Sequence, residues 1–70
     1  MPTEINLLIN GEPRSVPAGL SVETLLIHLG HKGERFAVEV NGDVVRREAR
    51  ALRILANDDQ VEIVGFVGGG

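Results

Sequence analysis

Residues 4–16 read EINLLINGEPRSV, and the order of apolar and polar side chains in this stretch decides the fold of the chain. Its first six residues alternate in polarity, which is typical of a strand with one buried face. The face expected to lie in the core carries Ile5, Leu7 and Ile9. Asn10-Gly11 then favours a type I′ hairpin turn, because both central residues of such a turn need a positive φ. A second strand is predicted at residues 14–16, at a sheet edge because prolines flank it.

Residues 21–30, SVETLLIHLG, predict an amphipathic helix. Ser21 is a good N-cap, and Glu23 places a negative charge in the first turn. One apolar stripe is formed at helical spacing by Val22, Leu25, Leu26 and Leu29. Gly30 stands where a left-handed C-terminal cap belongs.

The second half of the chain predicts a second hairpin and a last strand. Residues 36–40 alternate, Asn41-Gly42 repeats the turn signal, and a short strand follows at residues 43–45. Residues 46–53 fit either a short helix or an irregular crossing under the sheet. A turn at residues 57–59, NDD, precedes a strand at residues 60–67. The order β-β-α-β-β-β predicts an α+β fold in which a mixed sheet of four to five strands packs on one helix.

Size and composition limit the function. The 70 residues make one domain, which is too small to enclose a large pocket, so a complete enzyme is not expected. There is no cysteine, which excludes thiolate metal sites and is consistent with a cytoplasmic location. His28 and His31 lack further ligands at metal spacing, so no metal site is expected. No signal peptide or membrane span is predicted.

The net charge of −3 argues against nucleic-acid binding. The one basic cluster is RREAR at residues 46–50, which is interrupted by Glu48 and has no interleaved aromatic residue. A solvated turn or short helical segment is the preferred interpretation of this cluster. A docking patch for an acidic partner comes second and a nucleic-acid contact third.

The sequence ends in Val67-Gly68-Gly69-Gly70. Such a run adds almost no packing, and a frayed end or a cloning scar is the plain alternative. We expect residues 1–66 to form the folded domain and residues 67–70 a flexible tail. Extended, these four residues reach at most about 14 Å, so a terminal carboxylate on Gly70 would enter a channel too narrow for side chains.

Parity along the first and last strands places Leu8, Val64 and Phe66 on the face that the helix does not cover. If these strands are neighbours, the three side chains form a small apolar patch beside the root of the tail. An exposed apolar patch next to a mobile terminus indicates a partner interface.

Three stretches resemble one known family. They are LLINGEP at residues 7–13, SVETLL at residues 21–26, and VEIV at residues 61–64 followed by FVGGG at residues 66–70. Together they resemble the β-grasp, ubiquitin-like sulfur carriers, and most closely the ThiS-type carriers of thiamine biosynthesis. The middle of the chain departs from the family pattern, with Arg46-Arg47 in place of a Pro-Arg pair and no tryptophan.

The resemblance implies a β-grasp fold and a role as a protein co-substrate rather than an enzyme. An E1-like adenylyltransferase of the ThiF type would use ATP and Mg²⁺ to adenylate the Gly70 carboxylate, and the carrier itself would bind no cofactor. Sulfur would then replace AMP, and the thiocarboxylate would serve a thiazole synthase of the ThiG type. The small subunit of molybdopterin synthase, another sulfur carrier, a protein modifier joined to lysines through Gly70, and a plain β-grasp interaction module remain alternatives.

Overall fold

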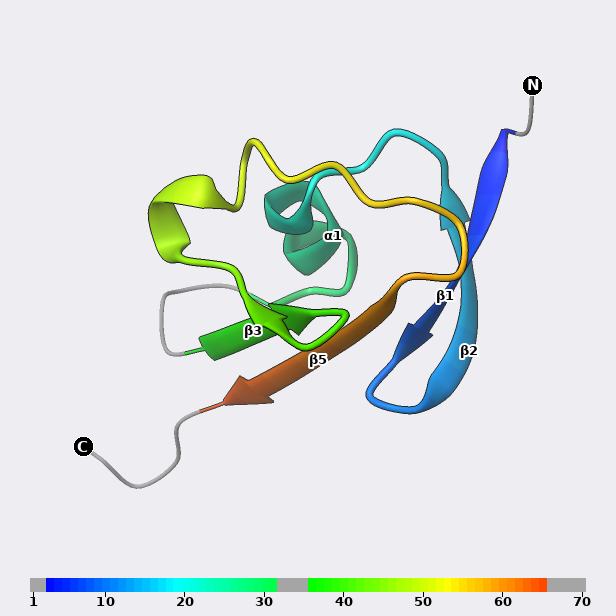
Figure 1. The fold of residues 1–70 in the computed structure, drawn as a ribbon. Coiled ribbons are helices and arrows are strands. Elements are labelled where there is room, and N and C mark those ends of the chain that lie inside the picture. Colours follow the sequence, from blue (N-terminus) through cyan, green and yellow to red (C-terminus); the bar gives the residue numbers. More distant parts are fainter. Residues whose placement is uncertain (1–2, 32–35, 66–70) are drawn as a thin grey trace.

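The computed structural model describes residues 3–31 and 36–65, which form a five-stranded mixed sheet and one α-helix (Figure 1). The strands are β1 (Glu4–Ile9), β2 (Glu12–Pro17), β3 (Phe36–Val40), β4 (Asp43–Val44) and β5 (Gln60–Gly65). The helices are α1 (Val22–His28) and the 3₁₀ helix η1 (Arg47–Ala49). The sheet order is β2-β1-β5-β3-β4, with β1 and β5 parallel and the other pairs antiparallel. The predicted α+β fold, with a mixed sheet of four to five strands packed on one amphipathic helix, is confirmed, and the sheet has five strands.

Both hairpin turns form at the Asn-Gly pairs, as the sequence predicts. Asn10 and Gly11 have φ values of 51° and 82°, and Asn41 and Gly42 have φ values of 53° and 87°. Positive φ at both positions is the type I′ geometry, which matches the right-handed twist of the flanking strands. The strand bounds differ from the prediction. β2 is longer and contains both prolines, which an edge strand tolerates, and the 3₁₀ segment begins soon after the short β4.

Helix α1 is capped by Ser21, whose side chain accepts a hydrogen bond from the backbone of Thr24, while the Thr24 hydroxyl accepts one from the Ser21 backbone. The capping box therefore uses threonine at its third position. Gly30 has a φ of 83°, which confirms the predicted left-handed cap. Helix α1 covers one face of the sheet (Figure 1), and the side chains of its apolar stripe pack in the core. The core comprises Ile5, Leu7, Ile9, Val16, Val22, Leu25, Leu26, Val38, Val40, Val45, Leu55, Val61 and Ile63.

The segment between β4 and β5, residues 45–59, is mainly an irregular crossing. It contains one short helix, η1, and then passes the first turn of α1, where it forms an isolated bridge between Ser21 and Ile54. Backbone carbonyls of Arg50 and Arg53 accept from the N–H groups of Glu23 and Val22 at 3.0 and 2.9 Å. The crossing thereby satisfies donors that have no partner within the helix.

Candidate partner-docking site

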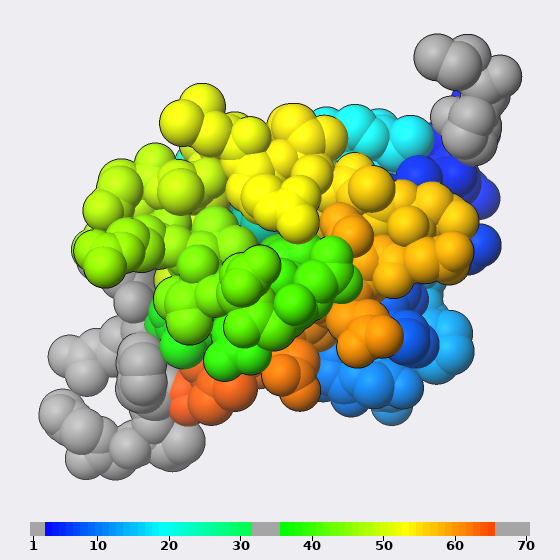
Figure 2. Space-filling view, in the orientation of Figure 1, coloured from blue at the N-terminus to red at the C-terminus, as the bar shows by residue number. Residues whose placement is uncertain are grey.

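Strand β5 is the centre of the sheet and the element that precedes residues 66–70, which include the predicted tail at residues 67–70. It lies between the parallel β1 and the antiparallel β3. Figure 2 shows its atoms (orange to red) at the surface between the β3–β4 hairpin (green) and the β1–β2 hairpin (blue). Residues 66–70 lie outside the described residues, so the predicted tail and the role of Val67, Gly68, Gly69 and Gly70 stay predictions.

The Asn10 side chain continues the sheet at the point where β1 ends. The last paired residues of β1 and β5 are Ile9 and Val61. Beyond them, the Ile63 N–H donates to Asn10 Oδ1 at 2.8 Å, and Asn10 Nδ2 donates to the Ile63 carbonyl at 3.2 Å. The amide side chain of Asn10 thus takes the place of a further strand residue beyond the end of β1. It satisfies backbone groups of Ile63 that would otherwise lack partners.

Asn41 holds the start of β5 in a similar way. The Gln60 N–H donates to Asn41 Oδ1 at 2.9 Å, and the Asn41 N–H donates to the Gln60 carbonyl at 2.8 Å. Asn41 Nδ2 also donates to Asp59 Oδ1 at 2.9 Å, while Asp59 Oδ2 accepts from the Ala56 N–H at 2.8 Å. Asp59 is buried, and these bonds satisfy both of its carboxylate oxygens.

Arg50 is the one member of the basic cluster that the structure buries, with only 7% of its surface exposed. Its Nη2 donates to the Phe36 carbonyl at 2.7 Å, and its Nε has no hydrogen-bond partner among the described residues. Phe36 is the β3 residue opposite Gly65, the last described residue of β5. The cluster is therefore a short helical segment followed by a structural arginine, and Arg50 does not belong to a solvated docking patch.

The predicted apolar patch is only partly assembled. Leu8 and Val64 do face away from the core, with 37% and 58% of their surfaces exposed. However, Leu8 is opposite Gln60, four residues before Val64 on the same strand. At about 3.3 Å per residue the two side chains are about 13 Å apart along β5. The expectation of one compact patch beside the tail root is therefore wrong for Leu8, because the register of a parallel pair cannot be read from parity. Phe66 lies outside the described residues.

Between these two positions the outward face is acidic. Glu39 of β3 is directly opposite Glu62 of β5. Like charges placed opposite one another disfavour the pairing of strands. We therefore interpret this pair as a feature of the surface chemistry of the face rather than as a stabilising contact. The face presents a carboxylate pair flanked by apolar groups, among them Val64 and the 67% exposed Val44.

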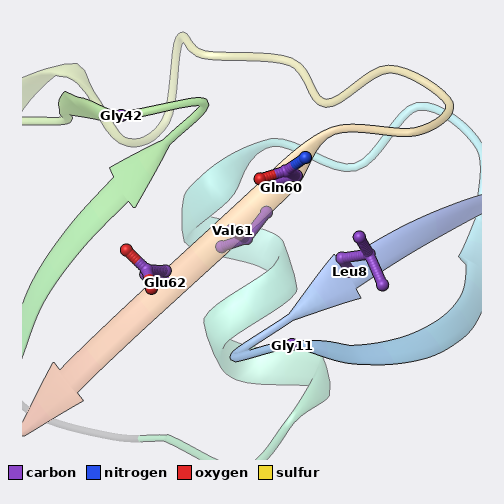
Figure 3. A pocket seen from close by; sticks show the side chains of 6 residues that line it. All are labelled: Leu8, Gly11, Gly42, Gln60, Val61 and Glu62. Carbon is purple, nitrogen blue, oxygen red and sulfur yellow. The ribbon is translucent and has the colours of Figure 1, made fainter.

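A shallow hollow of about 260 Å³ opens over the first half of β5 (Figure 3). Leu8 stands on one side of it, Gln60 and Glu62 project from β5, and the glycines of the two hairpin turns lie at its borders. Apart from each glycine and its two chain neighbours, no described atom lies within 4 Å of the position that a Cβ would take on Gly11 or Gly42. The hollow is smaller than typical small-molecule sites, and it fits one side chain of a docked protein better than a substrate.

Residues 3–31 and 36–65 contain no group of three or more His, Cys, Asp or Glu side chains placed to hold a metal ion. None of the helices in these ranges has the length and apolar character needed to cross a membrane.

Comparison with known proteins shows what this architecture is similar to. A crystal structure of a thiamine biosynthesis protein (ThiS) from Geobacter metallireducens superposes with a TM-score of 0.82 at 39% identity, covering 94% of this chain and all of that one. A thiazole synthase from Magnetococcus marinus is 47% identical over 62 residues, which are 89% of this chain and 19% of the synthase. The chain thus spans about a fifth of the length of the thiazole synthases that it matches.

Relatives of similar length also exist. The protein ycf40 of Porphyra purpurea, whose name describes it as uncharacterized, is 36% identical over 94% of this chain and 93% of its own length. The ThiS family matches residues 7–70, which include strand β5, bound by the Asn10 and Asn41 side chains, and the whole glycine-rich end. The chain therefore belongs to the ThiS family.

Proposed function

We propose that this chain is the sulfur carrier of thiamine biosynthesis and that sulfur is attached at Gly70. The observation that carries the proposal is the position of β5. It is the central strand, it is held by Asn10 and Asn41, and its sequence continues as FVGGG within the stretch that matches the ThiS family. A strand held on both sides, whose sequence continues through Phe66 and Val67 into three glycines, suits the delivery of a terminal carboxylate into a partner's site.

The chemistry requires activation of that carboxylate. A terminal carboxylate is ionised at neutral pH and is a competent nucleophile, but it is a poor acyl donor. In the proposed first step, a Gly70 carboxylate oxygen attacks the α-phosphorus of ATP, pyrophosphate leaves, and an acyl adenylate forms. A sulfur nucleophile at the oxidation level of sulfide then attacks the carbonyl carbon and AMP leaves. The product is a thiocarboxylate, and no electrons are transferred.

The partners supply everything else. An adenylyltransferase of the ThiF type would bind ATP and Mg²⁺ and exclude water from the labile adenylate. The acceptor of the sulfur would be a thiazole synthase. A stretch similar to this chain forms part of the thiazole synthase of Magnetococcus marinus, which supports placing the two activities together. The carrier then acts as a co-substrate, and its outward face holds the partner in register so that the terminus reacts as an intramolecular group.

Intact mass spectrometry of the protein from its native host, with and without a thiol-alkylating reagent, tests the proposal. The chain has no cysteine, so a fast stoichiometric adduct that maps to Gly70 would show a thiocarboxylate. The alkylation step is needed because oxidation of Met1 nearly mimics the exchange of oxygen for sulfur. A matched variant that lacks Gly69 and Gly70 should give no adduct.

Two results would contradict the proposal. One is the absence of an adduct even after incubation with ATP, a sulfur donor and the host's adenylating enzyme. The other is recovery of Gly70 in amide linkage to lysines of other proteins, which would indicate a protein modifier. The same spectra give the C-terminal residue of the chain in the cell.

A further inference from the structure

Strand β5 extends beyond the strand that pairs with it on one side. The ladder between β1 and β5 ends at Ile9 and Val61, because β1 turns away at Asn10-Gly11. β5 continues to Gly65, past the tip of the β1–β2 hairpin (Figure 1). On its other side, β3 accompanies β5 over its whole described length, as far as the pair Phe36–Gly65.

The alternation of hydrogen bonds shows which way each residue of β5 directs its backbone. The Asn41 N–H donates to the Gln60 carbonyl, so Gln60, Glu62 and Val64 direct their backbone groups to the β3 side. The intervening residues direct theirs to the β1 side. On that side, the Val61 carbonyl accepts from the Asn10 N–H at 2.9 Å, and the Ile63 backbone is bound by the Asn10 side chain.

Gly65 is the next residue in this series, and its N–H and C=O point into an open edge. No residue within 3–31 or 36–65 forms a hydrogen bond to either group, and Gly65 is exposed. The edge therefore offers one main-chain donor and one acceptor at Gly65, two residues after Ile63, which the Asn10 side chain binds.

The other two edges of the sheet are protected. β2 carries Pro13 and Pro17, which have no N–H to donate, and β4 is only two residues long. Where β3 continues past β4, the Val38 carbonyl accepts from the Val45 N–H at 2.8 Å and the Phe36 carbonyl accepts from Arg50 Nη2 at 2.7 Å. Natural proteins use proline and short strands to prevent unwanted pairing at sheet edges. Among the strand edges of the described residues, the one at Gly65 lacks such protection, and it lies at the root of the predicted tail.

We propose that this edge receives an extended segment of thiazole synthase as an added strand, with main-chain hydrogen bonds to Gly65. The inference rests on the proposed function, because thiazole synthase is the partner class that the proposed function assigns. Strand addition derives affinity from backbone groups and fixes direction and register. The Asn10 side chain blocks pairing earlier on β5, so the added strand starts at Gly65 and guides residues 66–70 toward the synthase.

A matched pair of variants tests the added strand. Gly65 is not among the residues with positive φ, so Gly65→Ala fits the backbone and keeps the N–H. Gly65→Pro removes the N–H that faces the open edge and leaves the bonds to β3 intact. Binding to the host's thiazole synthase is measured with carrier that bears no sulfur. We expect Gly65→Ala to bind like the parent chain and Gly65→Pro to bind about tenfold more weakly, since one main-chain bond is lost.

Amide exchange gives a second readout that needs no substitution. In the parent chain, the Gly65 amide should exchange at least several-fold more slowly when thiazole synthase is bound. Binding without protection at Gly65, together with equal affinities of the Ala and Pro variants, would overturn the added strand and leave the sulfur-carrier role in place. No binding of the synthase at all would overturn it too. A missing thiocarboxylate at Gly70 would instead contradict the proposed function, whatever happens at Gly65.

Discussion

Asn10 binds the backbone of Ile63 with both polar atoms of its side chain, at 2.8 Å through Oδ1 and 3.2 Å through Nδ2. The two residues are 53 positions apart in sequence. The same asparagine has the positive φ of 51° that the hairpin turn needs. One residue therefore forms the turn and also fixes that turn to the strand that leads into the predicted tail.

Replacing Asn10 with glycine separates these two roles. Glycine accepts the positive φ, so the hairpin should remain, but both hydrogen bonds to Ile63 are lost. We expect the free energy of unfolding to fall by about 1–2 kcal/mol, as measured by urea denaturation. Amide exchange should locate the effect, with the Ile63 N–H losing more protection than that of Leu7 in the centre of β1. Unchanged exchange at Ile63 would mean that the clamp does not persist in solution.

The sequence predicts the elements of this fold well because their signals are local. Asn10-Gly11 and Asn41-Gly42 impose the two turns, and both have the predicted positive φ. Ser21 caps the helix, and the apolar stripe that follows it faces the core. Alternation in β1 and β5 also gives the correct buried face, including outward positions for Leu8 and Val64.

What the sequence leaves open depends on contacts between distant residues. No residue next to Arg50 in sequence marks it as buried. The carbonyl that it binds belongs to Phe36 in β3, 14 residues away. Leu52 resembles a core residue, yet 80% of its surface is exposed, since the irregular crossing has no period that assigns it a side. The separation of Leu8 from Val64 likewise follows from register, which no local signal determines.

Arg50 is expected to stabilise the start of β3, where it binds the Phe36 carbonyl. Arg50→Met keeps most of the apolar volume but leaves the Phe36 carbonyl without its donor, so the free energy of unfolding should fall by about 1–3 kcal/mol. Arg53→Met is the matched control, because Arg53 Nη1 donates to its neighbour's carbonyl in an exposed setting. That control should change stability by less than about 0.5 kcal/mol. Equal stability of the two variants in thermal unfolding would show that the buried hydrogen bond contributes nothing net.

The outward face should contribute to partner binding without contributing to stability. Val64→Asp places a third carboxylate near the Glu39–Glu62 pair and removes an exposed apolar group, so affinity for the adenylating enzyme should fall about tenfold. Phe66→Asp is expected to weaken docking similarly, with little loss of stability.

Leu8→Asp, about 13 Å along the sheet, shows whether the interface extends over the hollow. Leu52→Asp, in the crossing, is the control for a charge at an exposed apolar residue. Severe unfolding of Phe66→Asp would instead place Phe66 in the core.

The last prediction concerns the thinness of the tail. Gly69→Val adds a β-branched side chain one residue before the proposed reacting carboxylate, four residues in sequence after Gly65, the last described residue. Thermal unfolding should be unchanged. Formation of the Gly70 adenylate, measured as pyrophosphate release, should be abolished because the valine side chain cannot enter a narrow channel. Gly69→Ala is the graded control and should retain part of the activity. Adenylation of Gly69→Val at the parent rate would refute the narrow-channel argument, since glycine would then be dispensable where the argument needs it most.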